Sequence, residues 1–382
     1  MENTKEGEEI VSENEVSPKS EKNALKKEVQ GTIVPIQTNG SAKVSEEEFF
    51  SILKMVAPGT NLRASLDGVL KIGKGALIAV ENNALASMLD GGFRVNCRFT
   101  PQRLMELTKM DGAITLSKDL KRISQANVML TPDSKIKSSE TGTRHKAAER
   151  TAKQTGGLVI AISERKNEIN LFYKNLKYNL KNTSDVLRRA NEHIQLLEKQ
   201  RELFDVHIDK LNALELRNHP NLNQALTVIQ KGKLIQKISD DLKRYVIELG
   251  SEGILMKTRL KELIVGVEKE TNLVIKDYTK LDTKKSRILL DSLSYDEILD
   301  SNNILSALAF ENNTKLVPIK GWRILSKTSL LDADVAKIIK QAGSLGKAVH
   351  SNPSEYSSVL GEDKIAMFKQ EIDRIKLNSF DY

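Results

Sequence analysis

Short apolar runs alternate with helical patterns in the part of the chain between residues 45 and 175. The run Leu158–Ile162 is apolar at every position, which is typical of a strand buried on both faces of a sheet. An amphipathic stretch from Glu46 ends at Pro58-Gly59 and predicts a helix that opens this region. We therefore expect an α/β domain over 45–175, with a mixed sheet flanked by helices. The predicted strands are 75–81, 94–99, 112–116, 126–130, 157–163 and 168–172, and the predicted helices are 84–89, 101–110 and 145–154.

From about Leu176 the pattern changes to long helical segments with few glycines. Apolar residues recur there at helical intervals, which predicts a long helix with one buried face. His219-Pro220 interrupts this helix and further stripes follow, so we expect an all-α bundle or spine over 176–310. The expected core positions are Leu187, Ala190, Ile194, Leu197, Phe204, Ile208 and Leu211, then Ile238, Leu242, Tyr245, Leu249, Met256, Leu260, Leu263 and Val267.

The two ends of the chain differ from both of these regions. Residues 1–44 are rich in Glu, Lys, Ser and Asn without a sustained period, which predicts a disordered tail. Residues 315–377 contain shorter helical patterns at 334–342, 345–350 and 364–375, with more Lys and Arg than Asp and Glu. Short helices with a basic surplus suit contact with a nucleic-acid backbone, although an oligomerisation module or a merely compact helical unit has the same pattern.

Composition narrows the class of protein. The chain has 382 residues, 39% of them apolar, which is enough for several domains with real cores. Cys97 is the only cysteine, so a disulfide framework and a cysteine-based zinc site within the chain are excluded. No apolar run is long enough to cross a bilayer and no signal core opens the sequence, so we expect a cytoplasmic protein. The net charge of +8 fits a polyanionic partner, but it also fits solubility alone.

The segment Thr143-Arg144-His145-Lys146 places cationic side chains where a helix is expected to begin. The N-terminal end of a helix is partly positive, so each cation there costs about 0.3–1 kcal/mol unless an anion is bound. A phosphate would reverse this effect, because backbone N–H groups at a helix start also bind anions. The segment therefore predicts a phosphate site, with a histidine that serves only the fold as the alternative.

Asp111-Gly112-Ala113 is a second candidate motif, in a turn between an expected helix and an expected strand. Asp-Gly is a common turn, but small residues also let a ligand approach the backbone closely. A lone carboxylate beside phosphates most naturally holds Mg²⁺, which takes its other ligands from phosphate and water. Ser163, at the end of an apolar strand, is either a ligand contact or a strand terminator.

His145 could act as a nucleophile's base, a metal ligand or a donor to an anion. No Ser-His-Asp or HExxH pattern surrounds it, so the donor role is favoured. The remaining histidines lie in predicted helical segments and are interpreted as structural or surface residues. They are His193, His207, His219 and His350.

These motifs together resemble the diadenylate cyclase domain of the DisA family of DNA integrity scanning proteins. The resemblance lies in Met110-Asp111-Gly112-Ala113, in Leu130-Thr131-Pro132, and above all in residues 142–152 followed by 158–164. It extends over nearly the whole chain after residue 44, because a cyclase domain, a helical spine and a helix-hairpin-helix-like module follow in the same order. Other diadenylate cyclases attach the catalytic domain to membrane helices, which this sequence lacks.

The resemblance implies synthesis of cyclic di-AMP from two ATP, with release of two pyrophosphates, across two catalytic domains that face each other. It implies a homo-oligomer, at least a dimer and by analogy an octamer, that binds branched DNA and associates with the nucleoid. By this resemblance Asp111 would bind Mg²⁺ or Mn²⁺ and promote attack by the ATP 3′-hydroxyl. Gly112, Ala113 and Leu130 would contact the nucleotide through the backbone, and Thr143, Arg144, His145, Lys146, Ala147 and Ser163 would line the phosphates.

The chain departs from the family pattern in two places. Lys146 and Ala147 stand where the family commonly has Arg and Thr, so a planar two-pronged donor and a hydroxyl are lost. Near the C-terminus the sequence reads Val359-Leu360-Gly361-Glu362-Asp363, where a helix-hairpin-helix usually has a Gly-x-Gly turn. Because of these departures a second interpretation remains, in which the protein is a DNA-binding scaffold whose nucleotide site is weakly active or inactive. A purely structural helical assembly is a third, which leaves the cations at 143–146 unexplained.

Overall fold

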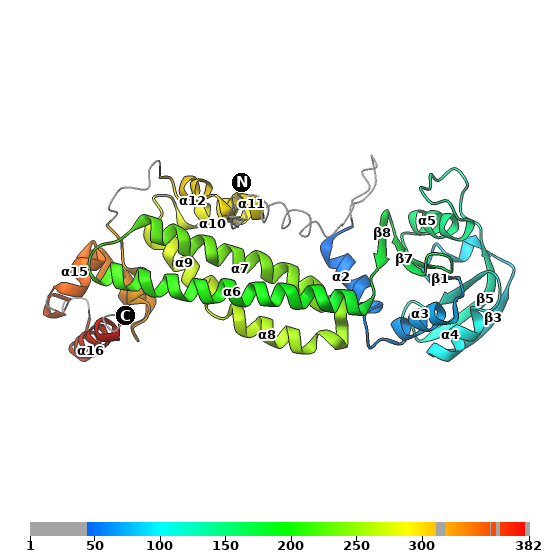
Figure 1. Ribbon diagram of the computed structural model, residues 1–382, viewed down its shortest axis with the longest axis horizontal. Helices are drawn as coiled ribbons and strands as arrows, with labels where there is room; N and C mark the ends of the chain where they lie inside the picture. The colour runs from blue at the N-terminus through cyan, green and yellow to red at the C-terminus, as the bar shows by residue number, and fades with distance from the viewer. Residues whose placement is uncertain (1–43, 311–317, 352, 357–359, 379–382) are drawn as a thin grey trace, which may run out of the picture. The chain divides into compact units, whose positions relative to one another are not determined.

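The computed structural model describes residues 44–310, 318–351, 353–356 and 360–378. Among these, residues 72–99 and 106–180 form one compact unit, and residues 45–71, 100–105 and those from 181 onward form another (Figure 1). The predicted tail lies outside the described residues except for Val44, and so does Val359 of the expected hairpin. The first unit is called the sheet unit below, and the second the helical unit.

The sheet unit is built on one mixed sheet with the order β2-β5-β4-β1-β6-β7-β8, and β3 pairs with β5. β1 and β4 run parallel, while the other neighbours are antiparallel. This confirms the predicted mixed sheet. The strands are β1 (Ala76–Val80), β2 (Leu89–Asp90), β3 (Phe93–Arg98), β4 (Ala113–Leu116), β5 (Arg122–Leu130), β6 (Leu158–Ser163), β7 (Glu168–Tyr173) and β8 (Leu176–Leu180).

Helix α5 (Thr143–Thr155) packs on this sheet through its small apolar residues. Ala148 and Ala152 are fully buried there, against Val159 of β6 and Phe172 of β7. Every residue of β1 is buried, and β6 is buried up to its last position. The continuous apolar runs thus mark strands covered on both faces, as predicted from the sequence.

Two predictions about local structure in the sheet unit are wrong. Residues 84–89, expected to be a helix, form a short 3-10 helix, η1 (Ala86–Met88), and then enter β2, because Leu89 pairs with Leu130 of β5. The spine was expected from Leu176, but 176–180 form β8, which a tight turn folds back on β7. Alternate exposure along β8 is that of an edge strand, and strand pairing overrides the helical appearance of the sequence there.

The helical unit begins with α2 (Glu46–Met55), whose start carries a capping box between Ser45 and Glu48. Its longest helices are α6 (Thr183–Leu216) and α7 (Leu222–Leu249), which pack side by side (Figure 1). The predicted stripe on α6 is buried from Ala190 to Leu211, whereas Leu187 is partly buried. The other helices are α3 (Asn61–Ile72), α4 (Pro101–Leu107), α8 (Ile254–Ile264), α9 (Val267–Tyr278), α10 (Thr283–Ser292), α11 (Tyr295–Leu299) and α12 (Ser301–Ala307), with a 3-10 helix η2 (Gly250–Gly253).

The C-terminal helices continue the core of the helical unit. They are α13 (Trp322–Leu325), α14 (Asp332–Ala342), α15 (Leu345–His350) and α16 (Glu362–Asn378), with a 3-10 helix η3 (Pro353–Tyr356). Short helices are thus present where the sequence predicts them. Their assignment as a helix-hairpin-helix module stays a prediction.

A buried polar network joins α13 to the ends of α6 and α9. Arg323 is fully buried and pairs with Glu215, which also accepts a hydrogen bond from Tyr278 Oη at 2.9 Å. Asp277 accepts the backbone N–H groups of Gly321, Trp322 and Arg323 at 3.0, 2.8 and 2.9 Å. Burial raises the pKa of Asp277 to about 6, against the opposing effect of these hydrogen bonds. The network fixes where α13 begins.

Candidate functional site

The register of the sheet brings the candidate residues of several strands to one end. Ala76 of β1 pairs with Ile162 of β6, and Ala113 of β4 pairs with Val128 of β5. Because β1 and β4 are parallel and β5 and β6 run against them, the starts of β1 and β4 lie with the ends of β5 and β6. This end of the sheet carries Asp111, Gly112, Ala113, Leu130 and Ser163.

The start of α5 reaches the same end of the sheet through Arg144. Its guanidinium lies over the backbone of Gly75, the residue before β1, so that a Cβ atom at Gly75 would overlap it. The same Cβ would lie 3.2 Å from the carbonyl oxygen of Ile162 in β6. The motif at 143–147 and the motif at 111–113 are therefore brought together by the fold, although they are far apart in the sequence.

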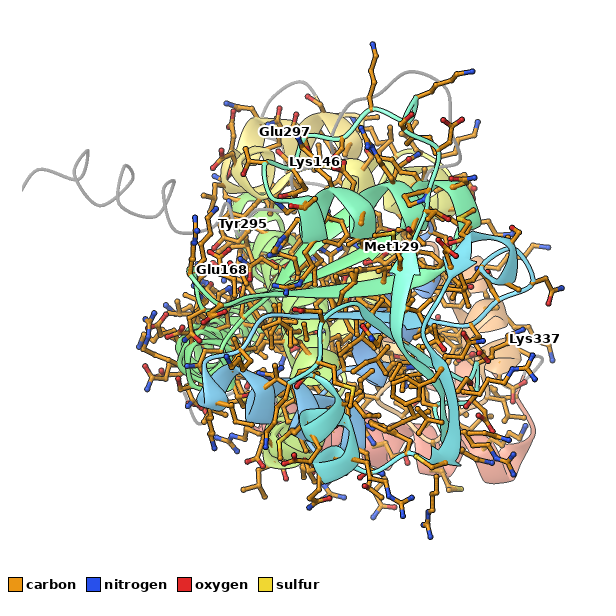
Figure 2. The ribbon with its side chains drawn as sticks, turned by 90° about the vertical axis from the view of Figure 1, so that its right-hand side faces the viewer. Met129, Lys146, Glu168, Tyr295, Glu297 and Lys337 are labelled. Atoms are coloured by element: carbon orange, nitrogen blue, oxygen red, sulfur yellow. The ribbon has the colours of Figure 1, made fainter. Side chains whose placement is uncertain are left out.

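The first turn of α5 has the charge pattern that the sequence indicates. Thr143, Arg144 and Lys146 are exposed, and the turn contains no acidic residue. Gly142 occupies the N-cap and offers no side chain to accept hydrogen bonds from the helix. Figure 2 shows Lys146 among the labelled exposed side chains of this unit. Free N–H groups, the helix dipole and nearby cations make this turn suited to an anion.

His145 is turned the other way, toward the sheet. Its Nε2 lies 3.4 Å from Nδ2 of Asn170 in β7, and its ring meets Phe172 edge-on with centroids 6.4 Å apart. Burial lowers the pKa of His145, the Glu140 carboxylate opposes this, and Lys177, Arg144 and Lys166 lower it further. A neutral imidazole is therefore favoured at neutral pH in the absence of a ligand.

The loop before α5 is tied to the helix by residues that the sequence reasoning missed. Glu149 is buried and accepts hydrogen bonds from Ser138 Oγ at 2.5 Å and from the N–H of Ser139 at 3.0 Å. Burial alone would raise its pKa, but hydrogen bonds from Lys153 and Ser138 hold it below the usual value. Arg150 Nε also donates to the carbonyl of Ile136 at 2.9 Å. Glu149 stands among small residues on the buried face of α5, and this was the sequence signal that could have indicated its structural role.

Gly112 has a structural reason to be glycine. Its φ of +85° lies in the left-handed region, and a Cβ atom there would come within 2.8 Å of the carbonyl carbon of Asn127. Asn127 itself has a φ of +54° and lies where the register of β4 and β5 shifts. The sharp turn keeps the backbone of Gly112 and Asp111 exposed at the sheet end.

The apolar candidate residues Ala113, Leu130 and Ala147 lie below the surface of the site. Ala113 and Leu130 are buried in the cluster between the sheet and α5, and the partly buried Ala147 packs against it. Met129, next to Leu130, is 64% exposed, because successive residues near the end of β5 alternate between its two faces. Ala113 is fully buried and Leu130 is 8% exposed, whereas Gly112 is exposed, so the backbone contacts of Ala113 and Leu130 with a nucleotide stay predictions.

Asp111 suits a metal ion that takes few protein ligands, such as Mg²⁺, better than a metal ion that is held by protein side chains alone. Its side chain is exposed, and among the described residues no group of three His, Cys, Asp or Glu could hold a metal. Mg²⁺ commonly takes one or two carboxylates and completes its shell with phosphate oxygens and water. The donor set therefore suits a metal that arrives with a nucleotide.

Ser163 lies at the right end of the sheet, but its hydroxyl already has a local partner. Its Oγ accepts the N–H of Lys166 at 3.3 Å in the turn between β6 and β7. This contact is the one expected of a strand terminator, and a hydroxyl can also serve a second partner. The ligand role of Ser163 stays a prediction.

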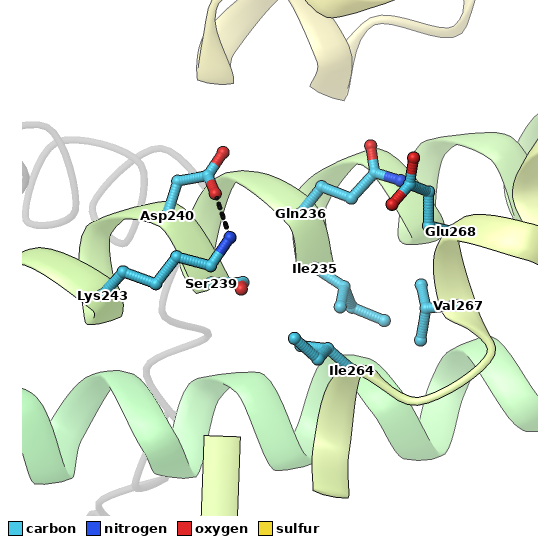
Figure 3. Close-up of a pocket in the computed structure, with 8 residues that line it drawn as sticks. All are labelled: Ile235, Gln236, Ser239, Asp240, Lys243, Ile264, Val267 and Glu268. Carbon is cyan, nitrogen blue, oxygen red and sulfur yellow. Dashed lines mark hydrogen bonds and ion pairs between the residues drawn. The ribbon is translucent and has the colours of Figure 1, made fainter. Parts of the chain in front are cut away.

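A separate pocket lies within the helical unit and includes none of these residues. Its cavity has a volume of about 250 Å³. Figure 3 shows its apolar floor of Ile235, Ile264 and Val267, with an ion pair between Lys243 and Asp240 at 2.8 Å. No sequence pattern indicates this pocket.

Comparison with known proteins follows the same division into sheet and helices. Residues 63–176 match a family model described as "DisA bacterial checkpoint controller nucleotide-binding", and residues 180–317 match the corresponding linker region. The chain thus combines a nucleotide-binding domain of the diadenylate cyclase class with a helical linker. In the described part of the chain, no helix is long and apolar enough to cross a membrane.

Curated relatives then define the family. The chain is 41% identical over 342 residues to the DNA integrity scanning protein DisA of Bacillus subtilis, covering 87% of this chain and 95% of that one. It is 38% identical to DisA of Acetivibrio thermocellus, covering 84% and 92% of the two chains. The protein belongs to the DisA family. A solved structure of Staphylococcus aureus DacA matches at 22% identity and a TM-score of 0.27, over 35% of this chain and 89% of that one, which supports no structural argument.

Proposed function

We propose that this protein is a diadenylate cyclase, a nucleotidyltransferase that condenses two ATP into cyclic di-AMP and releases two pyrophosphates. The observation that carries the proposal is the meeting of Asp111 and the uncapped, cationic start of α5 at one end of the sheet. The nucleotide-binding family model and the name of the curated relatives support it.

The start of α5 is proposed to hold the triphosphate. Thr143, Arg144, His145 and Lys146 would donate hydrogen bonds, and the free N–H groups of the first turn would add to them. The bound phosphates would also offset the cost of cations at a helix start. Ser163 is proposed as a further phosphate contact from the end of β6.

The 111–113 turn is proposed to hold the reacting end of the sugar. The backbones of Gly112, Ala113 and Leu130 would contact the nucleotide, which requires no side chain to be exposed. Asp111 is the residue that would hold Mg²⁺ or Mn²⁺, and a bound divalent ion supplies positive charge that favours deprotonation of a hydroxyl. Most of the catalytic effect would come from positioning and from electrostatic stabilisation of charge around phosphorus.

Two sites must face each other for the reaction to close a ring. Each 3′-oxygen attacks the α-phosphorus of the opposite ATP, a new P–O bond forms, and the bond to pyrophosphate breaks. One chain supplies one nucleotide and one Asp111, so the active species is a homo-oligomer, at least a dimer and by family analogy an octamer.

DNA binding is proposed for the C-terminal helices, with branched DNA regulating the cyclase in a cytoplasmic, nucleoid-associated protein. The name of the curated relatives, DNA integrity scanning protein, supports a DNA interaction. Lys340 and Lys347 are exposed on α14 and α15. Changing both to Gln should weaken binding to branched DNA and reduce its salt dependence, whereas Lys257→Gln, a change of an exposed side chain on α8, should not. Equal DNA affinity in the two variants would exclude α14 and α15 as the contact.

A DNA-binding scaffold with a weakly active or inactive nucleotide site is the second candidate. Lys146 and Ala147 favour it, because both remove phosphate contacts common in the family. The purified full-length chain, incubated with ATP and Mg²⁺ or Mn²⁺, separates the two. Cyclic di-AMP and pyrophosphate should accumulate in a 1:2 ratio, and nucleotide binding without product would favour the scaffold.

A further inference from the structure

The imidazole of His145 is held against β7 by two side chains on one face of that strand. Asn170 and Phe172 are two residues apart, so both point toward α5. Asn170 contacts the ring nitrogen Nε2 at 3.4 Å, and Phe172 meets the ring at an interplanar angle of 77°. The ring therefore has a defined orientation as well as a defined place.

The contact with Asn170 favours one position of the proton on the imidazole ring. Asn170 is 4% exposed, and a buried amide is unfavourable unless it is hydrogen-bonded. The atom that faces His145 is Nδ2, which can only donate. A neutral ring must then accept at Nε2 and keep its own hydrogen on Nδ1.

The other nitrogen, Nδ1, faces the start of α5. A Cβ atom at Gly142, the N-cap residue, would lie 3.7 Å from Nδ1. The unpaired N–H groups of the first helical turn are at the same place. An anion bound at this turn would meet Nδ1–H and the helix N–H groups together.

The charges around His145 favour the neutral ring before an anion arrives. Burial is the largest influence, and Lys177, Arg144 and Lys166 act in the same direction, while Glu140 acts against them. Glu140 has the largest influence among these charges and is itself paired with Lys177 at 2.5 Å, but the net effect still lowers the pKa of His145. With one N–H on a neutral ring, the choice of tautomer decides whether His145 can donate to the ligand at all.

We propose that Asn170 is a positioning residue that holds His145 as the Nδ1–H tautomer, so that Nδ1 is the donor to a phosphate at the start of α5. The identity of the ligand as a nucleotide phosphate rests on the proposed function. The tautomer does not, because it follows from contacts within the chain.

The tautomer can be measured directly in the full-length chain. Histidine labelled with ¹⁵N reports which ring nitrogen is protonated, and His145→Gln assigns the signal among the five histidines. We expect His145 in the ligand-free protein to be neutral at pH 7.5 with its hydrogen on Nδ1. A wild-type signal with the hydrogen on Nε2 would overturn the proposal without any variant.

Asn170→Asp provides the sharper comparison. A carboxylate at 170 accepts a hydrogen bond, so it should move the hydrogen to Nε2. It should also raise the pKa of His145 by about one unit or more, because a nearby negative charge favours the protonated ring. Asn167→Asp, in the exposed turn before β7, adds the same charge without the contact and should leave the tautomer unchanged. If the Asn170 and Asn167 variants give the same tautomer, Asn170 does not position the ring.

A binding measurement connects the tautomer to the site. ATP in the presence of EDTA cannot react, so its affinity reports binding alone. At a pH well above the raised pKa of His145, where the ring is neutral in both variants, we expect Asn170→Asp to weaken it about tenfold, the scale of one charge-assisted hydrogen bond, and Asn167→Asp to change it less than twofold. Equal affinities would overturn the role of Nδ1, whereas absence of cyclic di-AMP from wild-type protein would overturn the proposed function and leave this comparison valid.

Discussion

The guanidinium of Arg144 fills the space that a side chain at Gly75 would occupy, because a Cβ atom at position 75 would overlap Nη1 of Arg144. The φ of Gly75 is outside the left-handed region, so its backbone does not require glycine. The space for Arg144 is then the main reason for the absent side chain. Arg144 is exposed at a helix start, and the start of β1 gives it a defined resting place.

Gly75→Ala should displace Arg144 and weaken nucleotide binding. We expect a loss of about 1–2 kcal/mol in ATP affinity, the scale of one positioned hydrogen bond to a charge. The control is a double-mutant cycle with Arg144→Ala, in which Gly75→Ala should have no further effect. An equal loss in both backgrounds would mean that the added methyl acts on the Ile162 carbonyl instead.

Lys146→Arg should strengthen ATP binding. Lys146 is exposed, so the change disturbs no core, and Arg adds a planar fork that can bind phosphate through two N–H groups. We expect KM for ATP to fall about threefold to tenfold with little change in thermal stability. Lys166→Arg, on the exposed turn after β6, is the matched control. An equal fall in KM for this variant would mean that an arginine anywhere near the site strengthens ATP binding, and that position 146 has no special role.

Breaking the Arg323–Glu215 pair should destabilise the helical unit. Both side chains are fully buried, and removal of one partner leaves an uncompensated charge, which costs about 3–5 kcal/mol. We expect Arg323→Met to lower the urea midpoint clearly. Arg188→Met breaks the exposed pair with Glu192 and should cost less than about 1 kcal/mol. Similar midpoints for the two variants would contradict the importance of the buried network.

Asp277 should make the stability of the helical unit depend on pH. Its pKa is raised from 3.8 to about 6 when folded, so the folded state holds the proton more tightly than the unfolded state. The resulting stabilisation is complete below the unfolded pKa and is lost as pH rises through about 6. Asp277→Asn should therefore flatten the pH dependence of the unfolding free energy between about pH 4 and 6.5. An unchanged slope relative to wild type would show that Asp277 titrates normally.

The sheet was predictable where apolar runs are continuous, as in Leu158–Ile162, because burial on both faces leaves one interpretation. Residues 176–180 were mistaken for the start of a helix, because β8 is held by pairing with β7 and not by its own pattern. The helix predicted at 84–89 is wrong for the same reason, because Leu89 pairs with Leu130 of β5. Local sequence carries little information about such partners.

The candidate site is predictable from the charges of its residues and not from their arrangement in space. Three potentially cationic side chains at a helix start indicate an anion, whatever the sheet does. The residues that support them, Gly75 and Asn170, gave no sequence signal, since a single glycine or asparagine near a strand is common. Their roles depend on the antiparallel registers that place them beside α5.

Diadenylate cyclase activity and the role of Asp111 are tested together by cyclic di-AMP formation in wild-type protein and in Asp111→Asn, with ATP and Mn²⁺ or Mg²⁺. Asp119→Asn is the control, because Asp119 is an exposed turn aspartate of the same unit whose carboxylate only accepts local hydrogen bonds from Ser117 and Lys121. We expect product from wild type and Asp119→Asn, and a loss of at least about a thousandfold in Asp111→Asn, because the residue that would hold the metal is gone. Undiminished product from Asp111→Asn would exclude its catalytic role, and no product from wild type would exclude the cyclase activity.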